Sequence, residues 1–220
     1  MKLISAVLAR NEADRYLARV LDRLLQFSDH ILLLDDHSAD QTIEVAQSYG
    51  CLVQSRNGSG PMWGQERAAR AELWAWASQV AEDGWVLICD ADQILYGDIR
   101  PLMESWICNA WAFPLYDCWD QEQQYRADGY WQGYQLARPW FFCPSRVPDG
   151  YVPVWDREGL HTGHCPSNFP LACGSAPADI YWQHLGWLTL SDRNEKYQRY
   201  MAHQQHLTAF ELAHLESVHP

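Results

Sequence analysis

Residues 84–95 read Gly-Trp-Val-Leu-Ile-Cys-Asp-Ala-Asp-Gln-Ile-Leu, and this stretch decides the fold. An apolar run from Trp85 to Cys89 stops at two aspartates, Asp90 and Asp92, which one small residue separates. Such a run is typical of a strand that is buried on both faces of a parallel sheet. Ligands of open α/β sheets bind at the carboxyl ends of the strands, so the two carboxylates stand where a ligand is expected.

The chain before this stretch alternates short apolar runs with helical patterns. We expect strands over residues 2–9, 30–34 and 51–55. Helices are expected over residues 13–26, from the loop after Ala39 to Gly50, and from about 64 to 82. Ser38 and Gln41 have the spacing of a capping box for the second of these helices. The first helix is predicted by the spacing i, i+3, i+4, i+7, i+8 of Leu17, Val20, Leu21, Leu24 and Leu25. This alternation predicts an α/β fold with a mostly parallel central sheet sandwiched by helices.

The chain after about Ile99 has a different texture. Eight of the 12 tryptophans lie between Trp106 and Trp187, and the regular alternation of strands and helices is lost. A final helical segment is expected from about residue 191 to 216. We therefore predict an irregular, aromatic-rich C-terminal part that covers the ligand crevice of the same single domain.

Composition excludes several classes of protein. With 48% hydrophobic residues in 220, the chain can bury a core and is not intrinsically disordered. Its formal charge of -12 disfavours nucleic acid and anionic lipid as partners. No apolar run approaches the ~20 residues of a membrane span. Seven cysteines without a CxxC pair fit reduced thiols, so we expect a cytoplasmic protein.

Two acidic clusters follow predicted strands. Asp90 and Asp92 supply hard oxygen ligands of the kind that Mg²⁺ or Mn²⁺ prefers, and such an ion would bridge a diphosphate. The alternative is a solvated turn. Asp35 and Asp36 end the run Ile31–Leu34. One of them could accept a hydrogen bond from a nucleotide base or ribose. Alternatively, the negative charge of the pair could interact favourably with the dipole of the next helix at its N-terminus.

Histidines suggest further metal ligands. His184, in the run Tyr-Trp-Gln-His-Leu-Gly-Trp, is either an interior residue or a third ligand that joins the two aspartates. The cluster of His161, His164 and Cys165 has the spacing of part of a zinc site but lacks a clear fourth ligand.

Three stretches together resemble a known family. VLARNEADRYLARVL (7–21), ILLLDDHSADQTIEVA (31–46) and GWVLICDADQIL (84–95) are similar to the opening of family 2 glycosyltransferases, which have the GT-A fold. The resemblance covers roughly residues 1–100 and then only the run His184–Trp187. It implies that residues 1–98 bind a nucleotide sugar and that residues 99–220 bind the acceptor.

The resemblance also implies roles for single residues. The donor would be a nucleoside diphosphate sugar, with Mn²⁺ or Mg²⁺ as cofactor and Asp90, Asp92 and His184 as its ligands. Asp90 would face the ribose or the metal. The implied nucleotide contacts are Ala9, Arg10 and Glu12 after the first strand, Asp36 at the base, and Arg67 at the diphosphate.

The general base departs from the family pattern. Family 2 enzymes invert the anomeric centre, and a carboxylate deprotonates the acceptor hydroxyl. Many carry this acid just after a histidine, but Thr162 follows His161 here. The nearest acids are Asp156 and Glu158, of which we favour Asp156.

Other functions stay open at this point. A nucleotidyltransferase that makes nucleotide sugars would share the fold, but no glycine-rich loop follows the first strand. A zinc-stabilised binding module could be built on the second half of the chain. A dinucleotide-dependent dehydrogenase is disfavoured because no GxGxxG follows the first strand. The donor sugar, its hexosyl or pentosyl class, and the hydroxyl acceptor are not specified by the sequence.

Overall fold

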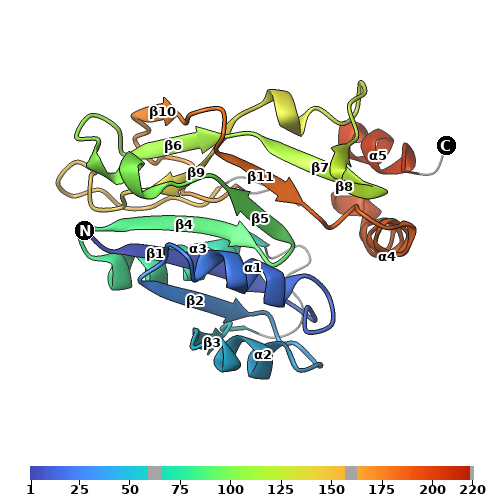
Figure 1. The fold of residues 1–220 in the computed structure, drawn as a ribbon, viewed down its shortest axis with the longest axis horizontal. Helices are drawn as coiled ribbons and strands as arrows, with labels where there is room; N and C mark the ends of the chain where they lie inside the picture. Colours follow the sequence, from blue (N-terminus) through green and yellow to red (C-terminus); the bar gives the residue numbers. More distant parts are fainter. Residues whose placement is uncertain (59–65, 157–162, 219–220) are drawn as a thin grey trace.

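A computed structural model describes residues 1–58, 66–156 and 163–218. In these ranges the central sheet has seven strands in the order β10-β6-β9-β4-β1-β2-β3 (Figure 1). Four of them come from the first hundred residues and three from the second half of the chain, so both halves build one sheet. The strands are β1 Leu3–Ala9, β2 His30–Asp35, β3 Leu52–Ser55, β4 Trp85–Asp90, β6 Ala110–Phe113, β9 Arg138–Phe142 and β10 Cys173–Ser175.

The first four strands are parallel, as the sequence predicts. β1 pairs in parallel with β2 and β4, and β2 pairs in parallel with β3. β9 is antiparallel to β4 and β6, and it connects the two halves of the sheet. Every residue of β1 is buried, because helices cover both of its faces. The expected α/β class with a mostly parallel, helix-flanked sheet is confirmed.

The flanking helices follow from apolar periodicity. α1 (Leu17–Leu24) and α2 (Thr42–Ser48) pack with the side of β1 that carries Leu3 and Val7. α3 (Glu66–Ala81) packs with the opposite side, which carries Ile4, Ala6 and Leu8. Four of the five predicted contact positions of α1 are buried, namely Leu17, Val20, Leu21 and Leu24. The prediction is wrong for Leu25, which follows the last residue of the helix and is 50% exposed.

A second, four-stranded sheet brings distant segments to the aspartates. Its order is β5 (Gln93–Tyr96), β11 (Tyr181–His184), β7 (Leu115–Trp119) and β8 (Gln121–Tyr125). β5 begins directly after Asp92 and pairs antiparallel with β11, with Gln93 opposite His184 (Figure 1). β11 in turn pairs with β7, so that His184 lies opposite Asp117. This register places Asp92, His184 and Asp117 at one end of the sheet.

The helical segment expected over 191–216 is present, and it is divided into two helices. α4 (Leu190–Met201) and α5 (Ala209–Glu216) flank a short 3₁₀ turn, η3 (Gln204–His206). Thr208 begins α5 with a capping box to Glu211, which starts a new helix rather than continuing the first. Two further 3₁₀ turns, η1 (Arg100–Glu104) and η2 (Gly133–Gln135), lie in the connections of the second half.

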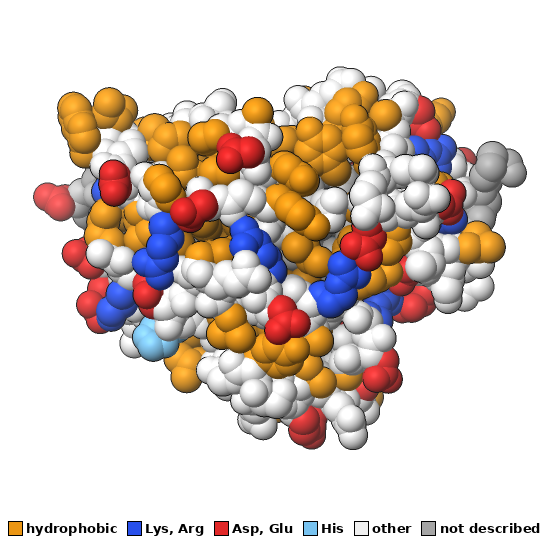
Figure 2. Space-filling view, in the orientation of Figure 1, with side chains coloured by type: hydrophobic (Ala, Val, Ile, Leu, Met, Phe, Trp, Pro, Cys, Tyr) orange, Lys and Arg blue, Asp and Glu red, His pale blue; other side chains and the backbone are white. Residues whose placement is uncertain are grey.

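Apolar side chains also gather on the surface. Figure 2 shows hydrophobic groups among scattered acids and bases over the upper part of the molecule, where Figure 1 places the strands of the second half. Trp106 and Ile107, before β6, are 84% and 68% exposed. In the described part of the chain, no helix has the length and hydrophobicity that crossing a membrane requires.

Candidate functional site

A pocket of about 680 Å³ lies at the carboxyl ends of β1 and β4. Its floor comes from the residues that follow these strands, including Arg10 and the Asp90–Gln93 segment. Its other walls come from α3, β7, β9, β11, α4 and α5, so both halves of the chain line the pocket. The pocket therefore lies where open α/β sheets bind their ligands.

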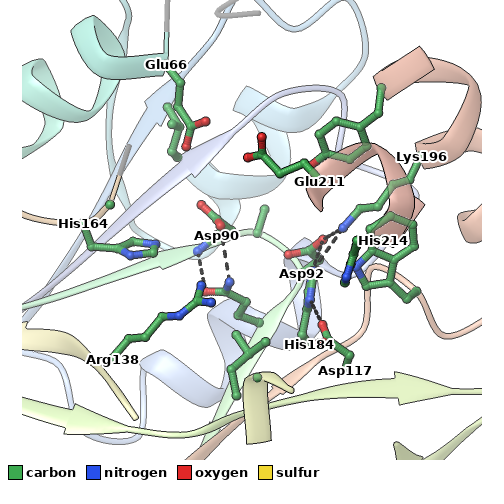
Figure 3. A pocket seen from close by; sticks show the side chains of 18 of the residues that line it. Glu66, Asp90, Asp92, Asp117, Arg138, His164, His184, Lys196, Glu211 and His214 are labelled. Carbon is green, nitrogen blue, oxygen red and sulfur yellow. Dashed lines mark hydrogen bonds and ion pairs between the residues drawn. The ribbon is translucent and has the colours of Figure 1, made fainter. Parts of the chain in front are cut away.

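Asp92 and His184 meet in this pocket from positions 92 residues apart. Nε2 of His184 lies 3.3 Å from Oδ2 of Asp92, and Nδ1 lies 2.6 Å from Oδ1 of Asp117. Figure 3 shows Asp92, His184 and Lys196 pointing toward one another, with Asp117 on the other side of the imidazole. A carboxylate on the second ring nitrogen fixes the orientation of the imidazole, as is typical of metal-binding histidines.

Lys196 of α4 completes this cluster. Its Nζ lies 2.8 Å from Oδ2 of Asp92 and 3.1 Å from Nε2 of His184. Burial acts to raise the pKa of Asp92, but Lys196 and His184 hold it well below its ordinary value. Burial and Lys196 act to lower the pKa of His184, but Asp92 and Asp117 outweigh them and raise it to about 9. The cluster thus sets two carboxylates against two basic groups.

Asp90 lies beside this cluster but has different partners. Nη2 of Arg70 donates to Oδ1 of Asp90 over 2.7 Å and to Glu66 over 3.1 Å. The side-chain amide of Gln93 donates to Oδ2 of Asp90 over 3.3 Å. Burial acts to raise the pKa of Asp90, but the positive charge and hydrogen bond of Arg70, together with His164, lower it below its ordinary value. Asp90 therefore faces the pocket as an ionised group held by α3.

Glu12 is a buried acid of the same pocket. Its carboxylate lies 3.3 Å from Nε of Arg15, and its side chain is 14% exposed. Burial, and next the negative charge of Asp92, raise the pKa of Glu12 to about 7, against the opposing charges of Arg15 and Lys196. A carboxylic acid that titrates near neutrality inside a pocket can bind or exchange a proton there.

The structure brings some of the predicted nucleotide contacts to the pocket and not others. Ala9, Arg10 and Glu12 line it. Asp36 is fully buried and is not among the described residues that line the pocket. Nε of Arg56 donates a hydrogen bond to its Oδ1 over 2.5 Å. Arg67 is exposed and also lies outside that lining. The basic residue that α3 presents to the pocket is Arg70, one turn further on.

The predicted base and zinc residues fall mostly elsewhere. Asp156 is exposed and is not among the described residues that line the pocket. Glu158 and His161 lie outside the described residues. His164 and Cys165 line the pocket, and the ring of His164 lies 4.1 Å from that of Trp140. Across residues 1–58, 66–156 and 163–218, no three His, Cys, Asp or Glu side chains group so that they could hold a metal ion.

Two of the three predicted metal ligands nevertheless fit a divalent cation. Asp92 Oδ2 and His184 Nε2 supply one oxygen and one nitrogen at adjacent positions, and Asp117 supports the imidazole. Mg²⁺ in phosphate sites takes few protein ligands and completes its shell with water and substrate phosphates. The donor pair therefore suits Mn²⁺ or Mg²⁺ whose remaining ligands are water or phosphate oxygens. Asp90 bonds Arg70 and Gln93 instead.

Sequence reasoning missed three residues of this site. Asp117, Lys196 and Arg70 were not singled out, because their partners lie 67, 104 and 20 residues away. One signal was present in the sequence. The chain has two lysines, and Lys196 follows His184 by 12 residues on a predicted helix.

Relatives of this chain have been found by sequence. No protein-family model matches it. An uncharacterized protein of Mycobacterium tuberculosis, Rv3786c, is 26% identical over 91% of this chain, and Mb3815c of Mycobacterium bovis matches equally. The chain spans about half (50%) of the length of these two curated relatives. An uncharacterized glycosyltransferase of Rickettsia bellii is 25% identical over 47% of this chain and 32% of its own length.

Solved structures share part of this fold. Staphylococcus aureus TarS in complex with UDP superposes with a TM-score of 0.43 at 16% identity, over 59% of this chain and 39% of its own. Glucosyl-3-phosphoglycerate synthase of Mycobacterium tuberculosis, in complex with Mn²⁺, UDP and glucosyl-3-phosphoglycerate, superposes with a TM-score of 0.37 at 24% identity. The match covers 53% of this chain and 44% of the synthase chain. The same synthase has also been crystallised with Mg²⁺ and UDP.

Proposed function

We propose that this protein transfers a sugar from a nucleoside diphosphate sugar to a hydroxyl acceptor, with inversion, as the resemblance to family 2 glycosyltransferases implies. The observation that carries the proposal is the meeting of Asp92 and His184 at 3.3 Å in a pocket at the carboxyl ends of the strands. The name of the Rickettsia relative, a glycosyltransferase, agrees with it.

Asp92 and His184 would hold Mn²⁺ or Mg²⁺ in this reaction. Bound there, the ion supplies positive charge that stabilises a departing diphosphate. Asp117 keeps the imidazole of His184 aimed at the position beside Asp92. Arg70 keeps Asp90 ionised at the edge of the pocket, where it can accept hydrogen bonds from a ribose. Arg10, which also lines the pocket, adds positive charge near the end of β1.

The acceptor hydroxyl needs a base, and Asp156 and Glu158 remain our candidates for it. Glu12 is a third candidate, because its pKa of about 7 suits proton exchange at neutral pH and it lines the pocket. The roles of Asp36 at the base and of Arg67 at the diphosphate are also proposals.

A binding panel tests the function. UDP, GDP, ADP, CDP and dTDP, and the corresponding sugars, are titrated by calorimetry with Mn²⁺ and with EDTA. We expect one nucleoside diphosphate to bind and to bind more tightly with Mn²⁺, and His184→Gln to lose the metal effect. At a hundred times its dissociation constant such a ligand stabilises the fold by about 2.7 kcal/mol, which thermal unfolding detects. Absence of binding across the whole panel overturns the proposal.

A further inference from the structure

Lys196 occupies the position that a cation would take between Asp92 and His184. Its ammonium is 2.8 Å from the carboxylate and 3.1 Å from the imidazole, and its side chain is 7% exposed. The ring of Trp187 lies 5.0 Å from Nζ and, besides the carboxylate of Asp92, supplies a favourable contact for a positive charge. The other lysine of the chain, Lys2, is 43% exposed and pairs with Glu82 on the surface.

Gly186 leaves room for this ammonium. A Cβ at position 186 would lie 1.9 Å from Nζ of Lys196 and 2.2 Å from Oδ2 of Asp92. Any side chain there would collide with the lysine and the aspartate at their point of contact. The run His184–Trp187 thus places three features around one ammonium group: the imidazole of His184, the space left by the missing side chain of Gly186, and the ring of Trp187.

The helix that carries Lys196 is fixed to the first half of the chain. Asp192, in the first turn of α4, accepts hydrogen bonds from Tyr16 over 2.8 Å and from Arg15 over 3.1 Å. It also closes a capping box with Thr189. Arg193 donates to the backbone oxygens of Trp187 and Leu188. Because α4 is held at its N-terminal end, the ammonium is positioned by the fold, and its release requires movement of the lysine side chain.

We propose that Lys196 is an internal competitor for the divalent cation at the Asp92–His184 pair. While no donor is bound, the ammonium balances the negative charge of Asp92, and a metal ion enters with displacement of Nζ. The reason is electrostatic, since an ammonium and a divalent cation that share two ligand atoms repel each other strongly at this separation. The consequence is weak binding of metal alone and stronger binding together with a diphosphate, which adds ligands. This inference rests on the metal site of the proposed function.

Metal titrations without nucleotide test the competition. Free Mn²⁺ is measured by electron paramagnetic resonance in wild type, Lys196→Met and the control Lys2→Met. We expect at least tenfold tighter Mn²⁺ binding by Lys196→Met and no change in Lys2→Met. Mn²⁺ binding by Lys196→Met that is equal to or weaker than that of wild type overturns the proposal.

A measurement on the wild-type protein avoids dependence on the folding of a variant. Lys2 and Lys196 are the two lysines of the chain, so acetylation of each amine is followed separately by mass spectrometry. We expect saturating Mn²⁺ with the bound nucleoside diphosphate to raise the acetylation rate of Lys196 several-fold and to leave that of Lys2 unchanged. An unchanged or slower rate at Lys196 contradicts the proposal.

The two proposals fail in different ways. If nucleoside diphosphates bind and Mn²⁺ affinity is the same with and without Lys196, the competition is wrong and the transferase proposal stands. If Mn²⁺ binds neither protein, the competition is also wrong, and the nucleotide panel alone decides the function. If the panel is negative while Lys196→Met gains Mn²⁺ affinity, the competition stands without the transferase.

Discussion

The guanidinium of Arg70 lies 2.7 Å from Oδ1 of Asp90 and joins α3 to the first aspartate of the Asp-Ala-Asp run. The same guanidinium contacts Glu66 at 3.1 Å, and its side chain is 6% exposed. One buried cation thus balances two carboxylates at the rim of the pocket. This contact separates the roles of the two aspartates, because Asp92 turns instead toward His184 and Lys196.

Arg70→Met should destabilise the protein and Arg67→Met should not. Removal of the guanidinium leaves Asp90 and Glu66 as neighbouring acids without their cation, at a cost of about 3 kcal/mol in the free energy of unfolding. Arg67 is exposed on the same helix, so its substitution should change this free energy by less than about 0.5 kcal/mol. Urea unfolding measures both. Equal losses in the two variants would show that Arg70 has no special role.

The ion pair of Asp92 and Lys196 should appear as coupling in a double-mutant cycle. Asp92→Asn leaves a buried ammonium, and Lys196→Met leaves a buried carboxylate, so each should lose about 3 kcal/mol of stability. The double variant removes both charges. Its loss in the free energy of unfolding should be smaller than the sum of the two single losses by about 2 kcal/mol. Strict additivity in urea unfolding would argue against the contact.

Asp117→Asn should weaken metal binding through His184. Asp117 touches the second ring nitrogen at 2.6 Å, and loss of such a partner typically lowers metal affinity 10- to 100-fold. Mn²⁺ titrations in the presence of the best-binding nucleoside diphosphate measure the effect. Asp98→Asn, which makes the same charge change at an exposed position, is the control. If both substitutions weaken Mn²⁺ binding equally, the effect comes from the net charge of the protein and not from the contact of Asp117 with His184.

The parallel half of the fold was predictable because its signals are local. The apolar runs of β1, β2 and β4 and the spacing in α1 depend on neighbours within a few residues, and the structure confirms these elements. The cap of α2 was not predicted correctly. Ser38 accepts from the backbone of Asn11 instead of capping the helix, whose first turn is served by Asp40. Several side chains compete for the same amide groups in such a loop, and the sequence does not rank them.

The site was predictable only in part, because helix phase and sheet register decide it. Arg67 and Arg70 lie one turn apart on α3, and which of them faces Asp90 depends on how the helix packs. Asp117 reaches His184 through the pairing of β7 with β11, which no local pattern specifies. By contrast, Asp92 and His184 each lie in a local motif, and the structure brings these two predicted residues together.

Asp156→Asn tests the predicted general base. A lost base typically lowers turnover 10²- to 10⁴-fold, while donor affinity should be unchanged because Asp156 lies outside the described lining of the pocket. Asp149→Asn, an exposed acid of the same segment, is the control and should keep full turnover. Single-turnover transfer and calorimetric donor binding separate the two effects. Full turnover of Asp156→Asn, with loss in Glu12→Gln, would assign the base to Glu12 instead.

The raised pKa of Glu12 predicts a stability that falls as pH rises. The pKa is about 7 in the folded protein and near its ordinary value of 4.5 in the unfolded chain, so the folded state holds more protons between these values. The free energy of unfolding contributed by Glu12 is therefore fully present below about pH 4.5 and decreases up to pH 7.

Glu12→Gln isolates this contribution from all other groups. Glutamine cannot ionise, so the variant should gain stability relative to wild type by up to about 3 kcal/mol between pH 4 and pH 8, at 1.36 kcal/mol per pKa unit. Urea unfolding at several pH values measures the difference, with Glu82→Gln as an exposed control that should stay flat. A difference that does not vary with pH would mean that burial and the nearby charge of Asp92 are offset by Arg15 and Lys196.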